Sequence, residues 1–115
     1  MLRIISFIFK NGISNSCREA VTRIIGIFIF RRWDVNVNRY PFVRGRERIE
    51  VGKNFRAGKH LHIEIIKEFN GKTYNGTLKV KDNVMMHHFI HIGVANYVEI
   101  GNNVLMASNI YISDH

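Results

Sequence analysis

From residue 49 onward, apolar residues recur at every sixth position. The positions that keep this step are Val51, Ala57 and Ile63, then Val80, Met86 and Ile92, then Ile100, Met106 and Ile112. A helix has 3.6 residues per turn and would not hold a six-residue spacing on one face. A six-residue unit fits one short strand and a tight turn, so three units complete one triangular coil. The spacing therefore predicts a parallel β-solenoid whose coils bury these side chains in one column.

A second apolar position lies four residues after most members of the first set. These residues are Phe55, Leu61, Val84, Ile90, Val104 and Ile110. Small or turn-forming residues follow the first apolar position, at Gly52, Gly58, Gly93, Gly101 and Ala107. Asn and Asp, which form tight turns readily, recur nearby. Both features favour short strands separated by corners, with the apolar side chains directed inward.

The six-residue step is interrupted twice, each time after the third unit of a coil. It lengthens to 17 residues between Ile63 and Val80, and to 8 residues between Ile92 and Ile100. If the triplets stack in register, both insertions leave one edge of the prism, and the end of the chain reaches that edge again. The longer insertion, 64–77, contains Asn70-Gly71, a typical hairpin turn, and is predicted to protrude as a loop or hairpin. Loops on a rigid scaffold carry binding groups, so we expect this edge to be functional.

The N-terminal third has a different pattern. Apolar residues at helical spacing, among them Val21, Ile24 and Phe28, predict an amphipathic helix over about 17–31. Two interpretations are open: its apolar face packs on the main domain, or it rests on an anionic membrane surface. We therefore divide the chain into an amphipathic helical segment (1–33), a basic connector (34–48) and the six-residue repeats (49–115).

The net charge limits the classes of molecule that this chain is expected to bind. Lys and Arg number 17 against 9 Asp and Glu, for a formal charge of +8, which favours polyanions. No nucleic-acid recognition motif accompanies this charge, so nucleic acid is not expected. No apolar stretch approaches the roughly 20 residues that span a bilayer. Cys17 is the only cysteine and cannot form an intramolecular disulfide, which favours a cytoplasmic protein, with the inner membrane as a peripheral contact for 1–33.

Three segments carry a resemblance to a known family. They are RYPFVRGRERIEVGKNFRAGKHLHIE (Arg39 to Glu64), IHIGVANYVEIGNNVLMASNIYISDH (Ile90 to His115) and the amphipathic N-terminus. Together they resemble the hexapeptide-repeat acyltransferases, in particular the branch that O-acetylates lipopolysaccharide and other surface polysaccharides. The resemblance implies a left-handed parallel β-helix, a homotrimer with active sites between neighbouring prisms, and acetyl-CoA as the acyl donor. It also implies a lipopolysaccharide or capsule-type glycan as acceptor.

The family pattern continues as Asp-His-x-His-Gly, and this sequence stops at the first histidine, His115. With about three coils, the chain is expected to be truncated at its C-terminus and to lack measurable acetyltransferase activity by itself. The alternative to an enzyme is an inactive remnant, or a non-catalytic basic β-solenoid that binds at the membrane surface.

Transfer of an acetyl group to a sugar hydroxyl needs a base, because a neutral hydroxyl is a weak nucleophile. Histidine is suited to this role, since its ordinary pKa is about 6.5. His115 follows an in-register strand at the insertion edge and is the candidate base; a solvated terminal histidine is the other interpretation. Asp114 is the candidate to orient an imidazole through a hydrogen bond, and it could equally form the turn.

Three further residues are candidates for contact with the acceptor. His87 and His91 fall between inward positions and should point away from the prism, toward a neighbouring subunit or a substrate. Asn96 lies in the two-residue excess at the functional edge, where it is either a polar contact or a turn residue. No cysteine or carboxylate accompanies the nearby histidines, so no metal is expected. The residues that would bind the cofactor cannot be assigned from the sequence.

Overall fold

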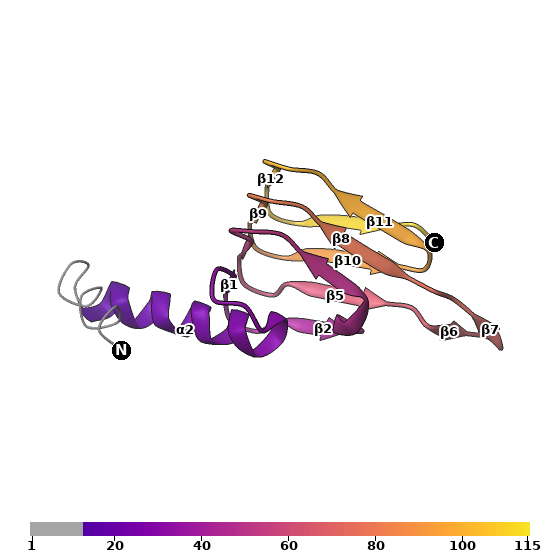
Figure 1. The fold of residues 1–115 in the computed structure, drawn as a ribbon, viewed down its shortest axis with the longest axis horizontal. Helices are drawn as coiled ribbons and strands as arrows, with labels where there is room; N and C mark the ends of the chain where they lie inside the picture. The colour runs from indigo at the N-terminus through magenta and orange to yellow at the C-terminus, as the bar shows by residue number, and fades with distance from the viewer. Residues whose placement is uncertain (1–12) are drawn as a thin grey trace.

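The computed structural model describes residues 13–115, with side chains from residue 19. Residues 1–12, the first part of the segment predicted to contact a membrane, lie outside the described residues. Among these residues helix α2 (Ile13–Phe30) comes first; its C-terminal end lies at the base of the strands, and the rest extends to one side (Figure 1). The first strands are β1 (Asn36–Val37), β2 (Phe42–Arg44), β3 (Ile49–Val51), β4 (Arg56–Ala57) and β5 (His62–Ile65). A 3-10 turn, η1 (Arg46–Arg48), precedes β3.

The chain continues through a small hairpin and then more strands of the same kind. The hairpin consists of β6 (Glu68–Phe69) and β7 (Lys72–Thr73). The strands after it are β8 (Thr77–Val80), β9 (Met85–Met86), β10 (Ile90–Val94), β11 (Tyr97–Ile100), β12 (Leu105–Met106) and β13 (Ile110–Ser113).

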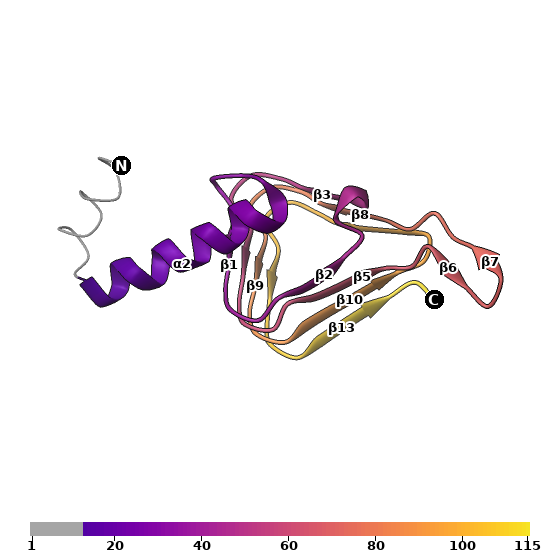
Figure 2. The ribbon, with the colours of Figure 1, turned by 90° about the horizontal axis from the view of Figure 1, so that it is seen from below.

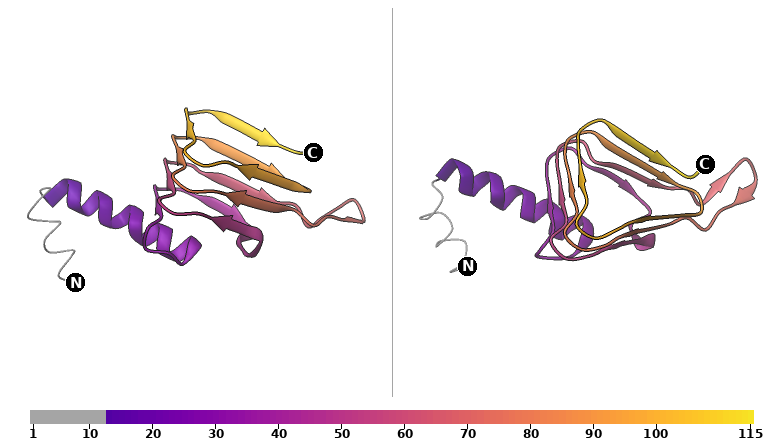
Figure 3. Two further views of the ribbon diagram at one scale, coloured as in Figure 1. Left: turned by 45° about the horizontal axis from the view of Figure 1, so that its top comes forward. Right: turned by 90° about the horizontal axis from the view of Figure 1, so that it is seen from above.

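All strands outside the hairpin belong to three parallel sheets. Their orders are β1-β4-β9-β12, β2-β5-β10-β13 and β3-β8-β11. Successive passes of the chain lie above one another and trace a triangular outline around one interior (Figures 2 and 3). The predicted class, mainly β with parallel strands after one helix, is confirmed.

The predicted column of apolar side chains forms the core. Eight of the nine positions that keep the six-residue step are buried, and Ile112 packs against them partly buried. Of the second apolar set, Phe55, Leu61, Val84 and Ile90 are buried, and Val104 and Ile110 are partly buried. Stacking follows the strand register, as in the run Val43, Ile63, Ile92 and Ile112.

The stack begins earlier than the first six-residue unit predicted. Strands β1 and β2 lie in the segment assigned to a basic connector, and they pair with β4 and β5. Val35 and Val37 are fully buried there. The signal was present, because Val37 and Val43 are six residues apart and Val51 follows after the same eight-residue step that separates Ile92 from Ile100.

Asparagines hold the same corner of three successive coils. Asn54, Asn83 and Asn103 have positive φ angles of 58°, 59° and 58°, a region that asparagine tolerates better than most residues. Their side chains form a ladder, in which the Nδ2 of Asn54 donates to the Oδ1 of Asn83 at 3.1 Å, and Asn83 donates to Asn103 at 3.2 Å. The recurring Asn therefore sets the turn and also links neighbouring coils.

Helix α2 packs on the base of the stack, as the first of the two interpretations predicted. Ile25, Ile29 and Phe30 contact the core, and the Phe30 ring meets that of Phe55 edge to face at 5.8 Å. The helix begins at Ile13, earlier than predicted, and ends at Phe30. Within residues 13–115, no helix combines the length and the apolar character that crossing a membrane requires.

Gly26 brings the helix into contact with the backbone that leads into β1. A Cβ placed on it would lie 2.8 Å from the carbonyl carbon of Val35, and closer still to its oxygen. We expect Gly26→Ala to lower the free energy of unfolding by about 1–3 kcal/mol, because backbone must shift to relieve overpacking. The gain in helix propensity, about 1 kcal/mol, acts in the opposite direction and is smaller.

Urea unfolding measures this effect, with Gly101→Ala as the matched control. Nothing lies within 4 Å of a Cβ at Gly101, so that variant should stay within about 0.5 kcal/mol of the parent protein. Equal stabilities for the two variants would contradict the packing of α2 described above.

Candidate functional site

The insertion edge carries a cleft of about 540 Å³. The cleft lies between the outer face of the β2-β5-β10-β13 sheet and the base of the β6–β7 hairpin. Its lining includes Arg44, Glu64, Lys67, Phe69, His91, Gly93, Tyr111 and His115. The C-terminal residues and the hairpin leave the prism at the same corner (Figure 2). The prediction that both insertions and the chain end share one edge is confirmed.

The predicted hairpin is present at this edge. Asn70 and Gly71 form its turn with φ angles of 54° and 77°, both in the left-handed region that such two-residue turns require. The neighbouring coil holds its base, because the Ile66 amide donates to the Val94 carbonyl at 2.8 Å and the Thr77 amide donates to Asn96 at 3.0 Å. Each side of the insertion is thus anchored on the scaffold.

A row of four rings crosses the outer face of the sheet beside the cleft. The centroids of Phe42 and His62 are 4.5 Å apart, those of His62 and His91 are 4.1 Å apart, and those of His91 and Tyr111 are 4.6 Å apart. The strand register places these residues opposite one another on β2, β5, β10 and β13. Stacking of this kind fixes ring orientation.

The environment of His91 favours its neutral form. Burial lowers the pKa of its imidazole, and positive charge on His62 or His115 would lower it further, while Glu64 acts in the opposite direction. A neutral imidazole can accept a proton at physiological pH. The adjacent His62 has a buried Nε2 without a hydrogen-bond partner, 3.6 Å from the Glu64 carboxylate.

His115 lies in the same cleft as His91. Its Nε2 lies over Gly93, where a Cβ would come within 2.8 Å of it. Its backbone amide donates to the Ser113 hydroxyl at 3.2 Å. Gly93 thus leaves room for an imidazole that a larger residue would displace.

Asp114 binds backbone in this structure. Its carboxylate accepts hydrogen bonds from the amides of Ala95, Asn96 and Tyr97 at 2.6, 2.8 and 2.8 Å. Partial burial raises the pKa of this carboxyl, but the three amides outweigh it and hold the pKa below its usual value. Of the two roles considered for Asp114, the observed contacts are those of a turn residue. These hydrogen bonds join the backbone of Asn96, whose side chain is exposed, to the end of β13.

His87 lies apart from this group. It is exposed after β9 and lines a separate cavity of about 280 Å³, together with Thr22, Asn36 and Arg56. Four of the five predicted site residues, His91, Asn96, Asp114 and His115, therefore lie at one edge, and His87 does not. Among residues 13–115, no cluster of three or more His, Cys, Asp or Glu is arranged to hold a metal ion.

Four residues near this site, His62, Glu64, Arg44 and Tyr111, were not predicted from the sequence. Their signal is the register of the coils, because Tyr111 lies opposite His91 and His62 lies opposite His91 on the other side. The two offsets differ because the hairpin lengthens one coil. The predicted alignment of Ile63, Ile92 and Ile112 nevertheless implies this row, since His62, His91 and Tyr111 are the residues directly before them. Arg44 and Glu64 are likewise opposite each other, with Nη1 and Oε1 3.6 Å apart.

One curated protein shows similarity to this chain. Over 78 residues the chain is 31% identical to the Escherichia coli (strain K12) protein named "Putative lipopolysaccharide biosynthesis O-acetyl transferase WbbJ". The aligned region covers 67% of this chain and 36% of that protein, so the chain spans about a third of the relative's length. No protein-family model matches the chain, and no solved structure matches it significantly.

The hydrogen bonds of Asp114 predict a pH-dependent stability. Asp114→Ala should lower the free energy of unfolding by about 1–3 kcal/mol at pH 7, because three amides lose their charged acceptor. Since the pKa of Asp114 is lowered in the folded state, its contribution is full above the ordinary value of about 3.9. The contribution disappears as the pH falls through the lowered pKa. Urea unfolding from pH 7 to pH 3 should therefore show the variant and parent converging, and a constant difference would contradict it.

The charges around His91 predict how its titration responds to substitution. Glu64→Gln should lower the pKa of His91 further, because it removes the one nearby group that raises it. His115→Ala should raise that pKa, because it removes an imidazole whose charge acts to lower the pKa of His91. NMR titration of the imidazole resonances measures both shifts, and His87→Ala, outside the cleft, should cause neither.

Proposed function

We propose that this chain is part of an acetyl-CoA-dependent O-acetyltransferase that modifies a bacterial surface polysaccharide, such as lipopolysaccharide O-antigen or a capsule-type glycan. The similarity to the Escherichia coli protein supports the acyltransferase class. The three parallel sheets around one apolar column support the finer proposal of a left-handed parallel β-helix.

The observation that carries the proposal is the pair of imidazoles, His91 and His115, in one cleft beside an anchored hairpin. In the proposed reaction, His115 accepts the proton of the sugar hydroxyl as its oxygen attacks the thioester carbonyl. The tetrahedral intermediate then collapses, the C–S bond breaks, and the imidazolium returns the proton to the departing thiolate. Base catalysis of this kind contributes roughly 10²- to 10⁴-fold to a rate.

His91 and Asn96 are proposed as acceptor contacts. A neutral His91 can donate one hydrogen bond and accept another, which suits a sugar hydroxyl. Asp114 is proposed to act indirectly, by fixing the turn that carries Asn96 and the backbone next to His115. His87 is separated from this cleft and could contact an acceptor only from another direction.

The proposed acetyl donor is acetyl-CoA, and the proposed assembly is a homotrimer. In such a trimer the cleft would face a neighbouring prism, and that prism would complete the donor site. No residue of this chain is assigned to the cofactor, because the charged groups nearest the cleft already have partners: Arg44 lies by Glu64, and Lys67 pairs with Glu47.

The test uses a protein that carries this segment within its complete reading frame. Incubated with acetyl-CoA and extracted polysaccharide, it should release free thiol and place labelled acetate on the glycan. His115→Ala should lower kcat by about 10²-fold or more, because no base then accepts the hydroxyl proton. His91→Ala should raise KM for the glycan.

His87→Ala is the matched control and should leave both constants near those of the parent. Full activity of His115→Ala would eliminate this residue as the base. Acetylation of a small free acceptor, with the polysaccharide left unlabelled, would contradict the substrate class.

A further inference from the structure

We propose that the outward side of α2 is a docking surface for an anionic phospholipid bilayer. This docking face is defined by Ile24, Phe28 and Arg46, which line one apolar cleft. It lies at the base of the stack and contains none of the residues proposed for catalysis or for acceptor binding, so the proposal stands independently of the proposed enzymatic activity.

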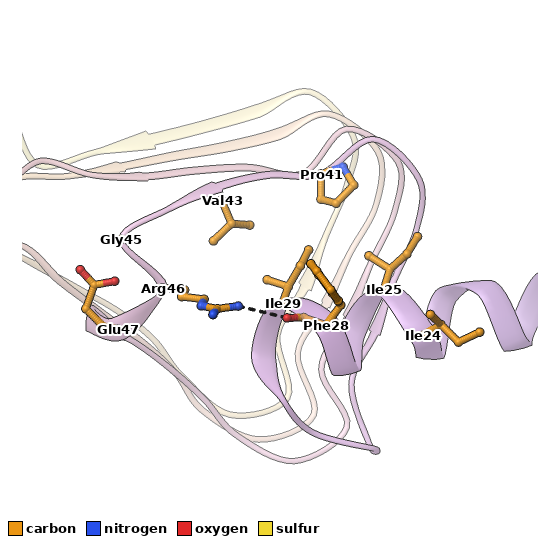
Figure 4. Close-up of a pocket in the computed structure, with 9 residues that line it drawn as sticks. All are labelled: Ile24, Ile25, Phe28, Ile29, Pro41, Val43, Gly45, Arg46 and Glu47. Atoms are coloured by element: carbon orange, nitrogen blue, oxygen red, sulfur yellow. Dashed lines mark hydrogen bonds between the residues drawn. The ribbon is translucent and has the colours of Figure 1, made fainter.

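The apolar part of the docking face is not used by the fold. Ile25 and Ile29 turn toward the core, while Ile24 and Phe28, one position earlier on each turn, are 62% and 80% exposed. Figure 4 shows them along an apolar cleft of about 610 Å³, which Pro41 and Val43 close on the other side. Large exposed apolar groups grouped in this way mark an interaction surface.

Arginines hydrogen-bond to the backbone of the residues that carry exposed rings. The Nη1 of Arg46 donates to the carbonyl of Phe28 at 3.1 Å, and the Nη1 of Arg23 donates to the carbonyl of Trp33 at 3.4 Å. Trp33 itself is 69% exposed. Cationic groups on the same surface as exposed apolar side chains are expected at a membrane interface, where apolar groups enter the acyl boundary and cations meet phosphates.

The charge of the surroundings favours lipid over a second copy of this chain. Glu47, the acidic residue that lines the same cleft, is paired with Lys67. A two-fold contact through this face would bring Arg46 toward the basic groups of an identical surface, in a chain of net charge +8. An anionic bilayer presents the opposite charge and an apolar layer together.

The test is sedimentation of the whole 115-residue chain with vesicles of phosphatidylcholine, with and without phosphatidylglycerol. Binding should require phosphatidylglycerol and weaken as salt is added. Phe28→Ser should weaken binding about fivefold, because it removes the most exposed ring. Arg46→Gln should weaken it by a similar factor, about fivefold, on anionic vesicles.

Two matched controls lie far from the docking face. Leu105, on β12 at the opposite end of the stack, is 68% exposed, and Leu105→Ser should bind as the parent does. Lys72→Gln, in the hairpin, makes the same change of charge as Arg46→Gln and should have less effect.

Vesicle binding that neither Phe28→Ser nor Arg46→Gln changes would overturn the proposal. If Phe28→Ser instead abolished self-association in sedimentation velocity, with vesicle binding intact, the occupant would be a second copy. If it lowered the unfolding midpoint with vesicle binding intact, other residues of the chain would cover this face. Either result would also overturn the proposal.

Discussion

The stacking of each coil on the next, in fixed register, is the constraint on which the rest of this structure depends. Parallel strand pairing places Ile92 against Ile63 on one side and Ile112 on the other. Each strand residue lies next to the equivalent residue of the neighbouring coil. Side chains of the same kind at equivalent positions therefore form a column along the stack. The buried apolar column, the asparagine ladder at one corner and the row of rings on one face all follow from this register.

The interior was predictable from the sequence, because a six-residue apolar step has few structural explanations. The start of the stack was harder to predict, since β1 and β2 contribute only Val37 and Val43 in a segment otherwise rich in basic and polar residues. The edge that carries His91 and His115 was also predictable from the two broken steps. Its composition was not, because the coil alignment places His62 and Tyr111 beside His91 but does not reveal that Arg44 and Lys67 line a cleft with His91.

Asp114 illustrates why residue type alone does not assign a chemical role. A carboxylate next to a histidine in sequence is a natural candidate to orient the imidazole. Here the backbone turns so that the carboxylate reaches three amides of the neighbouring coil. Free amide groups at a corner compete for the same oxygens as a neighbouring side chain, and the sequence does not reveal which of them is within reach.

The anchoring of the hairpin makes it an interchangeable module. Its two ends are held by Val94 and Asn96, which are only two residues apart in the neighbouring coil. The chain can therefore leave the scaffold and return to it at nearly the same place, whatever the length between. An insertion of different size or composition could replace the hairpin here without altering the alignment of the strands in the three parallel sheets. The length of the segment that lies beside the cleft can therefore change while the core stays intact.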